Sequence, residues 1–303
     1  MSELHLVDQL RGQLLKKEPL SNYLSWRTGG PADYLYLPAD LEDLSHFLSQ
    51  LPKDLPLTWI GLGSNTLVRD GGIEGVVIIT QGALNKINPT KNAYEVRAEA
   101  GVASAQLARF TARLGARGLE FLAGIPGTVG GALAMNAGCF GGETWNFVHL
   151  VETISREGVI KSRPASDFAI SYRHVEGPAN EWFVAGHFKL QSGDKEKSLQ
   201  DIRELLEKRN HSQPTGVANC GSVFRNPLGH YAGRLIEECG LKGKRIGGAS
   251  VSEKHANFIL NESNATSADI ENLIVEIGDW VQKKTGVQLI PEVCIIGRRE
   301  GAQ

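Results

Sequence analysis

The sequence lacks the features that mark membrane proteins, secreted proteins and nucleic-acid-binding proteins. No apolar run approaches the roughly 20 residues that a membrane-spanning helix needs. The stretch from Met1 to Lys17 carries Glu3 and Asp8 and has no apolar core, so it does not resemble a signal peptide. The formal net charge is −2 and the pI about 6.5, which gives no electrostatic reason to bind nucleic acid. We therefore expect no membrane and no nucleic-acid partner.

Cysteine and the usual metal-binding patterns are also scarce. The chain has four cysteines, no CxxC pair and no cluster of aspartates. Scattered cysteines without paired spacing indicate free thiols in a reducing cytoplasm rather than disulfides or a zinc site. We therefore expect a cytoplasmic protein without a metal. The four residues are Cys139, Cys220, Cys239 and Cys294.

Glycine, in contrast, is abundant at 35 residues, and it concentrates in one central stretch, residues 124–138. This stretch holds five glycines, one proline and no charged side chain. Glycine allows other groups to approach the backbone closely, and clustered backbone N–H groups can bind an anion such as phosphate. The pattern suits a cradle for the diphosphate of a dinucleotide. A glycine-rich turn between two buried elements explains it equally well.

A second glycine loop, Gly61-Leu-Gly-Ser-Asn65, follows an apolar stretch that reads as a strand. The dinucleotide-binding fingerprint of the Rossmann fold requires a third glycine and a following helix. Position 66 is threonine, and Asp70-Gly71-Gly72 interrupts any helix, so the Rossmann interpretation fails. A plain strand-to-turn junction explains this loop taken alone. Two such loops together strengthen the diphosphate interpretation.

Hydrophobic periodicity predicts a mixture of helices and strands. Expected helices cover about 4–16, 40–48, 102–114, 199–209, 231–239 and 266–281, the last opened by a capping box at Thr266 and Asp269. Expected strands cover about 34–37, 57–62, 75–80, 94–98, 148–154, 158–162, 182–190, 255–260 and 289–296. In such a strand His255 and Asn257 would share one face. The polar stretch 191–198 is the best domain boundary.

Three polar residues stand out by their setting. Arg173 follows Tyr172, and an arginine can bind a carboxylate with two parallel hydrogen bonds. Ser222 lies between Gly221 and an apolar pair, and Glu292 lies within an apolar stretch. Each also has a simpler explanation: a surface arginine, a turn serine, and a glutamate that points to water from a strand edge. From the residues alone these alternatives stay open.

Seven motifs in the same order identify a resemblance that covers about residues 20 to 297. The chain resembles the UDP-N-acetylenolpyruvoylglucosamine reductases, flavoenzymes of peptidoglycan synthesis, in their shorter subtype that lacks an inserted tyrosine-bearing loop. The motifs are Ser25-Trp-Arg-Thr-Gly-Gly-Pro-Ala32, Gly61-Leu-Gly-Ser-Asn65, Gly124-Ile-Pro-Gly-Thr-Val-Gly-Gly131, Asn136-Ala-Gly138, Ser171-Tyr-Arg173, Gly221-Ser-Val-Phe-Arg-Asn-Pro227 and Pro291-Glu-Val293.

The resemblance implies an α+β fold: a two-lobed FAD-binding domain of the vanillyl-alcohol-oxidase (PCMH) type and a C-terminal α/β substrate-binding domain. We expect the first lobe at 1–80, with the segment 288–303 returning to it. The second lobe is expected at 81–191 and the substrate domain at 199–287. The resemblance also implies FAD along the two glycine loops, with cofactor contacts at Gly61, Gly63, Ser64, Asn65, Thr66, Gly124, Ile125, Pro126, Gly127, Thr128, Gly130, Gly131 and Gly138.

The implied reaction has two halves: NADPH reduces the flavin, and the flavin then passes hydride to C3 of an enolpyruvyl group on a UDP-sugar. Ser222 corresponds to the proton donor to C2, while Arg173 and Glu292 would hold the developing charge and orient the substrate carboxylate. Substrate contacts are expected at Arg225, Asn226, His255 and Asn257. The product serves cell-wall synthesis, hence cell shape and division. The expected form is a monomer.

The chain departs from the family pattern at two positions. Arg225 replaces the usual lysine, which keeps the charge but changes the geometry, and Cys294 replaces the usual arginine after Pro-Glu-Val. Two other functions stay open at this stage. One is an FAD oxidase or dehydrogenase of the same fold that acts on an alcohol or sugar. The other is a sugar-nucleotide-binding module without catalysis.

Overall fold

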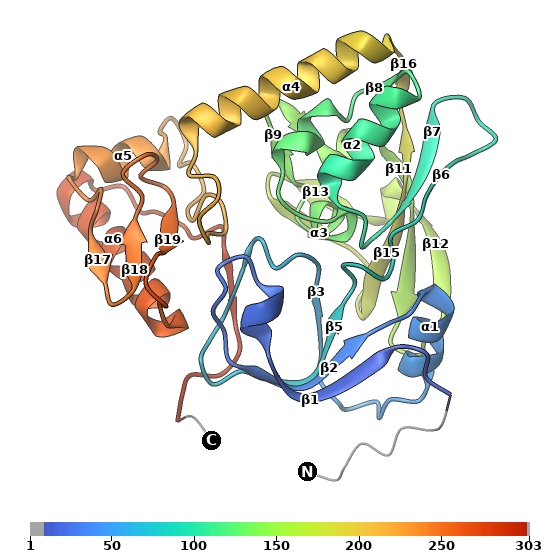
Figure 1. Cartoon of the computed structure of the whole chain (residues 1–303), viewed down its shortest axis with the longest axis horizontal. Coiled ribbons are helices and arrows are strands. Elements are labelled where there is room, and N and C mark those ends of the chain that lie inside the picture. The colour runs from blue at the N-terminus through green and yellow to red at the C-terminus, as the bar shows by residue number, and fades with distance from the viewer. Residues whose placement is uncertain (1–8, 302–303) are drawn as a thin grey trace. The chain divides into compact units, whose positions relative to one another are not determined.

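The computed structural model describes residues 9–301 of the chain (Figure 1). The described residues divide into two compact units, each made of discontinuous segments. Unit 1 comprises the described part of Met1–Leu15 together with Leu35–Leu62 and Val76–Glu207. Unit 2 comprises Lys16–Tyr34, Gly63–Gly75 and the described part of Lys208–Gln303. Among the described residues no helix combines the length and the apolar character that crossing a membrane requires.

A four-stranded sheet has the order β1-β2-β5-β3, with strands Gln13–Pro19, Pro31–Leu37, Ile73–Ile79 and Leu57–Ile60. Strands β3 and β5 pair in parallel from Leu57↔Val76 to Ile60↔Ile79. The helix expected over 4–16 is wrong where the structure describes it, because residues 13–16 belong to β1; residues 4–8 of that expectation lie outside the described part. Pairing at the edge of a sheet overrides the helical spacing of the leucines.

Unit 1 is built around a five-stranded antiparallel sheet of order β12-β11-β15-β7-β6 (Figure 1). Its helices α2 (Ser104–Arg113) and α3 (Val129–Ala134) pack together, and α3 lies against β15. Helix α1 (Leu41–Ser49) is capped by the Asp40 side chain and buries Leu44, Phe47 and Leu48, as the periodicity predicts. The strands are Ile160–Pro164, Val148–Ser155, Glu181–Lys189, Glu95–Glu99 and Ile87–Pro89.

Short elements complete the described chain, most of them in unit 1. Three two-stranded pairs are β9–β10 (Gly138–Cys139, Gly142–Glu143), β13–β14 (Ala169–Ser171, His174–Glu176) and β8–β16 (Ala116–Arg117, Gln191–Ser192). The 3-10 turns are Leu20–Tyr23, Glu120–Gly124, Thr144–Asn146 and Ala165–Asp167. Helix α4 (Lys195–Ser212) begins inside the polar stretch 191–198.

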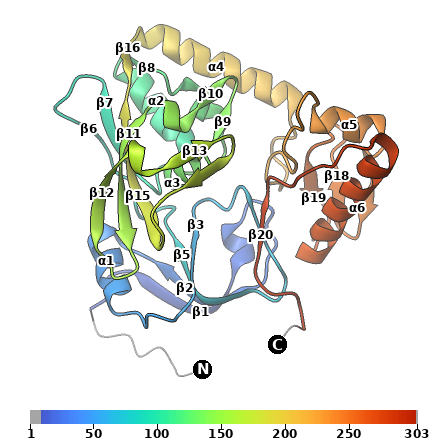
Figure 2. The ribbon, with the colours of Figure 1, turned by 180° about the vertical axis from the view of Figure 1, so that it is seen from behind.

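Unit 2 packs helices α5 (Ala232–Glu238) and α6 (Ser267–Thr285) beside a small sheet of order β17-β18-β19. Helix α6 has the predicted capping box between Thr266 and Asp269, and Gly286 ends it at φ 76°. Figure 2 shows β20 (Cys294–Ile296), which pairs in parallel with β4 (Thr66–Val68). The sheet strands are Arg245–Ile246, Ala249–Val251 and Ile259–Asn261.

Two predicted strands of unit 2 are shorter than expected. Strand β19 covers Ile259–Asn261, so only residues 259–260 of the predicted region 255–260 are extended. The expectation that His255 and Asn257 share one face of a strand is therefore wrong; both lie in the turn before β19. Similarly, β20 covers only 294–296, while Pro291 forms an isolated bridge with Phe224. Proline lacks the N–H that a continuous ladder requires.

Trp26, from the first family motif, is the largest fully buried side chain of unit 2. Its Nε1 donates a hydrogen bond to the Ile259 carbonyl at 2.8 Å, and its own carbonyl accepts from Asn261 Nδ2 at 2.8 Å. The indole lies in the same apolar cluster as Leu67, Ile270 and Val293. Trp26 therefore ties the segment 16–34 to β19 and to the core of unit 2.

We predict that Trp26→Phe lowers the free energy of unfolding by about 1–3 kcal/mol, because the buried Ile259 carbonyl loses its donor. Urea denaturation followed by far-UV circular dichroism measures the change. Trp280→Phe is the matched control, since Trp280 is 45% exposed, and should change stability by less than about 0.5 kcal/mol. Equal stability of W26F and the parent would contradict the prediction.

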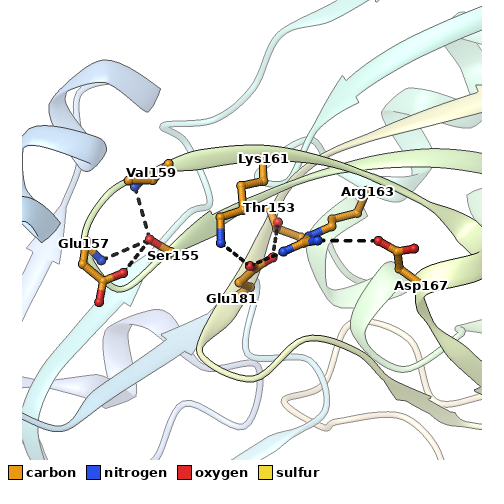
Figure 3. A network of polar contacts seen from close by, with 8 residues as sticks. All are labelled: Thr153, Ser155, Glu157, Val159, Lys161, Arg163, Asp167 and Glu181. Carbon is orange, nitrogen blue, oxygen red and sulfur yellow. Dashed lines mark hydrogen bonds and ion pairs between the residues drawn. The ribbon is translucent and has the colours of Figure 1, made fainter.

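Glu181, at the start of β15, is the centre of a polar network in unit 1 (Figure 3). Its Oε1 accepts hydrogen bonds from Lys161 Nζ at 2.8 Å and Arg163 Nη2 at 2.7 Å. Its Oε2 accepts from Thr153 Oγ1 at 2.7 Å and Arg163 Nε at 3.1 Å. The bonds from Arg163, and then from Lys161 and Thr153, lower the pKa of Glu181 from 4.5 to about 2 against the opposing effect of burial.

Because the folded state holds this carboxylate charged, the stabilisation is complete above pH 4.5 and is lost as the pH falls from 4.5 towards 2. We predict that Glu181→Gln lowers the urea midpoint at pH 7 and that its gap to the parent narrows below pH 4. Urea titrations at several pH values measure the gap. Glu74→Gln, at an exposed position, should show no gap at any pH. A gap for E181Q that is independent of pH would argue against the prediction.

Candidate functional site

Within unit 1 a cavity, here called the glycine cavity, collects three of the predicted cofactor residues: Gly61, Gly130 and Gly131. A Cβ on Gly61 would lie 2.4 Å from Thr128 Oγ1, so only glycine permits this approach. The Thr128 side chain in turn accepts a hydrogen bond from the Gly131 amide at 3.4 Å. The other lining residues are Trp59, Ile60, Thr80, Ala100, Ala134, Thr153, Phe168, Val175, Gly177, Pro178, Glu181, Trp182 and Phe183.

The expectation that residues 124–138 present free backbone N–H groups is wrong for part of that stretch. The amide of Ile125 donates to Leu122, and the amides of Val129 and Gly130 donate to Val102 and Ala100. Within the described chain, no hydrogen bond from the amides of Gly127 or Thr128 to another residue is present. The later glycines therefore allow tight backbone packing, while the amides of Gly127 and Thr128 can still offer donors to an anion.

The second glycine loop continues in unit 2, where its backbone turns at Gly63. Gly63 has φ 62°, and its carbonyl accepts a hydrogen bond from the Ser25 amide at 3.2 Å. The amides of Gly63, Ser64 and Asn65 donate to no group of residues 9–301. Successive free amides at a turn with positive φ form a concave site for a phosphate oxygen.

Arg173 lies at the tip of the β13–β14 hairpin of unit 1 and is held in place by backbone carbonyls. Its Nη2 donates to the Gly138 carbonyl at 2.6 Å and its Nη1 to the Asn136 carbonyl at 3.4 Å. Its backbone adopts φ 55°, which is uncommon for a residue with a side chain. The Asn136 side chain donates from Nδ2 to the Ser171 carbonyl at 3.2 Å, so the Asn136-Ala-Gly138 motif fixes this hairpin.

A cavity of unit 2, here called the serine cavity, gathers four predicted residues: Ser222, Asn226, His255 and Asn257. Arg225, although adjacent in sequence, does not line it. The remaining lining residues, Tyr231, Gly233, Arg234, Glu237, Lys254 and Ala256, were not predicted. Tyr231, Arg234 and Glu237 are spaced by three along α5 and its N-cap, a helical periodicity of polar residues that could have pointed to them.

Asn257 shapes the segment that carries Ser222. Its Oδ1 accepts from the Phe224 amide at 3.0 Å and its Nδ2 donates to the Phe224 carbonyl at 2.9 Å, while its backbone carbonyl accepts from the Val223 amide at 2.9 Å. The side chain thus replaces a strand partner for residues 223–224. Asn226 similarly accepts from the Ala232 amide at 3.0 Å and holds the start of α5.

The charge of the serine cavity is set by a neutral histidine and by a lysine that has no ion-pair partner in the described chain. Burial lowers the pKa of His255, and its Nδ1 accepts from the Asn257 amide at 3.2 Å, so the ring is neutral and carries its proton on Nε2. Arg234 is paired with Glu238, and Glu237 with Lys242. Lys254 Nζ bonds the Asn210 carbonyl and forms no ion pair within the described chain. The cavity therefore favours an anion.

Glu292 is half-buried in unit 2. It lies outside the strands, and hydrogen bonds of its backbone amide and carbonyl hold it in place. Its amide donates to the Val223 carbonyl at 2.7 Å, and its carbonyl accepts from Asn65 Nδ2 at 3.1 Å. The next residue but one, Cys294, donates its amide to the Asn65 carbonyl at 2.9 Å. Asn65 of the glycine loop and Val223 beside Ser222 therefore both fix Glu292. Arg173 belongs to unit 1, and Ser222 and Glu292 to unit 2.

Two family models match different parts of the chain, and the two cavities fall mainly in different parts. Residues 32–162 match a family model described as "FAD binding domain". Residues 213–296 match one described as "UDP-N-acetylenolpyruvoylglucosamine reductase, C-terminal domain". The glycine cavity draws mainly on the first region and its C-terminal continuation, and the serine cavity lies within the second.

Full-length relatives and a solved structure extend the match over nearly the whole chain. The UDP-N-acetylenolpyruvoylglucosamine reductase of Alkalilimnicola ehrlichii is 55% identical over 289 residues, 95% of this chain and 96% of that protein. The reductase of the same name from Coxiella burnetii (strain Dugway 5J108-111) is 54% identical over 308 residues, 96% of this chain and 98% of that protein.

The crystal structure of UDP-N-acetylenolpyruvylglucosamine reductase from Thermus caldophilus matches with a TM-score of 0.80 and 32% identity, over 95% of this chain and 99% of that chain. The fold also resembles 6-hydroxy-D-nicotine oxidase from Arthrobacter nicotinovorans, with a TM-score of 0.58 at 13% identity. The predicted α+β fold, an FAD-binding domain of the PCMH type with a C-terminal substrate domain, is confirmed. The chain belongs to the UDP-N-acetylenolpyruvoylglucosamine reductase family, and it is an oxidoreductase.

Proposed function

We propose that this protein reduces the enolpyruvyl group of UDP-N-acetylglucosamine enolpyruvate to give UDP-N-acetylmuramate, with FAD as its cofactor and NADPH as the reductant. The observation that carries the proposal is the gathering of Ser222, Asn226, His255 and Asn257 around one cavity inside the region that matches the reductase family. When bound, FAD would supply the chemistry of hydride transfer between NADPH and C3 of the enolpyruvyl group.

The chain has the features that an FAD diphosphate needs. The close approach of Gly61 to Thr128 leaves room beside the backbone, and the amides of Gly127 and Thr128 are available as donors. In unit 2 the amides of Gly63, Ser64 and Asn65 are available in the same way. Backbone donors of this kind suit a diphosphate because they need no side-chain ordering. Contacts to FAD at Thr66, Gly124, Ile125, Pro126 and Gly138 are proposed together with those of the other predicted cofactor residues.

Arg173, Ser222 and Glu292 divide the chemistry at the substrate. Hydride addition at C3 builds negative charge on C2 and on the neighbouring carboxylate. Arg173, already oriented by the carbonyls of Gly138 and Asn136, stabilises that charge with no further reorganisation. Ser222 Oγ donates the proton to C2, and Glu292 orients the carboxylate. A serine hydroxyl is a weak acid, so neighbouring groups must assist this transfer.

The charge of the serine cavity suits the diphosphate of a UDP-sugar. Lys254 supplies a cation without a carboxylate partner in the described chain, and His255 supplies an N–H donor from Nε2. A hydrogen bond from a charged donor to phosphate is stronger than a neutral one. Arg225 is proposed as a further contact from outside the cavity lining.

We predict that Ser222→Ala leaves flavin reduction by NADPH at the parent rate but slows oxidation of the reduced flavin by the enolpyruvyl substrate by about 100- to 10,000-fold. Stopped-flow absorbance of the flavin separates the two halves. Ser263→Ala is the control, because Ser263 is exposed in the same unit, and both of its rates should match the parent.

Two results would count against the function. The parent protein is first loaded with flavin and reduced. If the enolpyruvyl sugar nucleotide then oxidises the reduced flavin no faster than buffer alone does, the reductase proposal fails. In that case turnover of an alcohol or sugar would favour an oxidase of the same fold. If S222A slows both halves equally, Ser222 does not have the proposed role.

We also predict that Gly131→Ala lowers FAD affinity about tenfold or more, equivalent to about 1.4 kcal/mol. The added Cβ meets only Thr128 Oγ1, at 3.7 Å, so the protein itself tolerates it, but the methyl group enters the glycine cavity. Equilibrium titration of apoprotein with FAD measures the affinity. Gly278→Ala, whose Cβ meets nothing within 4 Å on α6, is the control and should bind FAD normally. Unchanged FAD affinity in G131A would place the cofactor elsewhere.

A further inference from the structure

Two tryptophans of unit 1 form an aromatic wall of the glycine cavity. Trp59 belongs to β3 and Trp182 to β15, and both line the cavity. Their rings stack with centroids 5.2 Å apart and an interplanar angle of 14°. Both side chains are partly exposed rather than buried in the core. A stacked pair that keeps accessible surface beside a cavity offers a face to another planar ring.

Trp59 also has a buried donor that the protein does not use. Its Nε1 is inaccessible to solvent and has no hydrogen-bond partner among residues 9–301. Leaving a buried N–H unpaired costs about 1–3 kcal/mol, and a buried indole N–H normally has an acceptor. By comparison, the indole N–H groups of Trp26 and Trp145 both bond backbone carbonyls. The Trp59 N–H is therefore suited to an acceptor on a bound ligand.

Glu181 anchors the wall but cannot itself bind the ligand. It directly precedes Trp182, and each of its carboxylate oxygens already accepts two hydrogen bonds, from Lys161, Arg163 and Thr153 (Figure 3). A carboxylate has about four acceptor positions, so none remains for a ribose hydroxyl. The network fixes the start of β15 and thereby Trp182. The contacts to the ligand must therefore come from the two indoles.

The position of the aromatic wall indicates which end of FAD it contacts. Trp59 and Gly61 are two residues apart at the end of β3, about 7 Å along an extended chain, and both line the glycine cavity. In FAD one ribose separates adenine from the diphosphate, whereas a longer five-carbon ribityl chain separates the isoalloxazine ring. Arg173, which must face the reacting ring, is not among the described residues that line this cavity. A planar site this close to Gly61, the first glycine of the proposed diphosphate loop, suits adenine.

We propose that the Trp59–Trp182 pair binds the adenosine end of FAD, with adenine packed on the indole pair and Trp59 Nε1 donating to an acceptor atom of the adenosine. This inference rests on the proposed placement of FAD in the glycine cavity. It predicts a preference for FAD over FMN that comes from two residues outside the glycine motifs, and it makes Glu181 a positioning residue.

The test uses apoprotein and the two halves of the cofactor, AMP and FMN, alongside FAD. Trp59→Phe keeps the ring and removes only the N–H donor, and Trp182→Leu removes the stacked partner. Isothermal titration calorimetry should show AMP and FAD binding weakened about 3- to 10-fold in W59F, the value of one hydrogen bond, and weakened further in W182L. FMN binding should not change in either variant. Trp280→Phe, on the exposed side of α6, is the matched control.

The outcomes separate this inference from the proposed function. Equal weakening of FMN and FAD with unchanged AMP binding would place the isoalloxazine ring on the wall and overturn the inference. Unchanged binding of all three ligands in W59F and W182L would also overturn it. The AMP measurement decides alone if FMN binds too weakly to measure. A parent protein that binds FAD and AMP but does not reduce the enolpyruvyl substrate would refute the function and leave this inference intact; a parent that binds neither refutes both.

Discussion

The approach of Gly61 to Thr128 brings the end of β3 against the turn before α3, two segments far apart in the sequence. A Cβ at position 61 would lie 2.4 Å from the threonine hydroxyl, which is closer than real side-chain contacts allow. The glycine cavity opens beside this contact, and its aromatic wall begins two residues upstream at Trp59. Missing side chains in the glycine motifs thus create both the tight packing and the space next to it.

An asparagine side chain fixes the backbone beside each of the three candidate catalytic residues. Asn136 bonds the Ser171 carbonyl near Arg173, Asn257 bonds both backbone groups of Phe224 near Ser222, and Asn65 bonds the carbonyl of Glu292. An amide side chain both donates and accepts, so it can replace a strand partner where the chain is irregular. These contacts help to hold the three candidate catalytic side chains, which lie on a hairpin tip or on irregular segments.

Much of the local structure could be predicted because it depends on neighbouring residues. The capping box and apolar face of α6 are local signals, and the helix begins and ends close to the predicted limits. The family resemblance, read from seven short motifs, is confirmed by relatives 55% identical over almost the whole chain. The errors lie where distant pairing decides: β1 replaces part of a predicted helix, and the turn of His255 and Asn257 replaces part of a predicted strand.

The sequence by itself determined the fold class and the family, and it supplied the candidate residues that lie in its motifs, because these depend on patterns that are contiguous along the chain. Tertiary structure alone decided which backbone amides remain available and which side chains line each cavity. The amides of Val129 and Gly130 are consumed by Val102 and Ala100, while Trp59 and Trp182, more than a hundred positions apart, meet as one wall. Hydrogen bonding and stacking between distant segments follow from packing of the whole unit, and no local pattern encodes them.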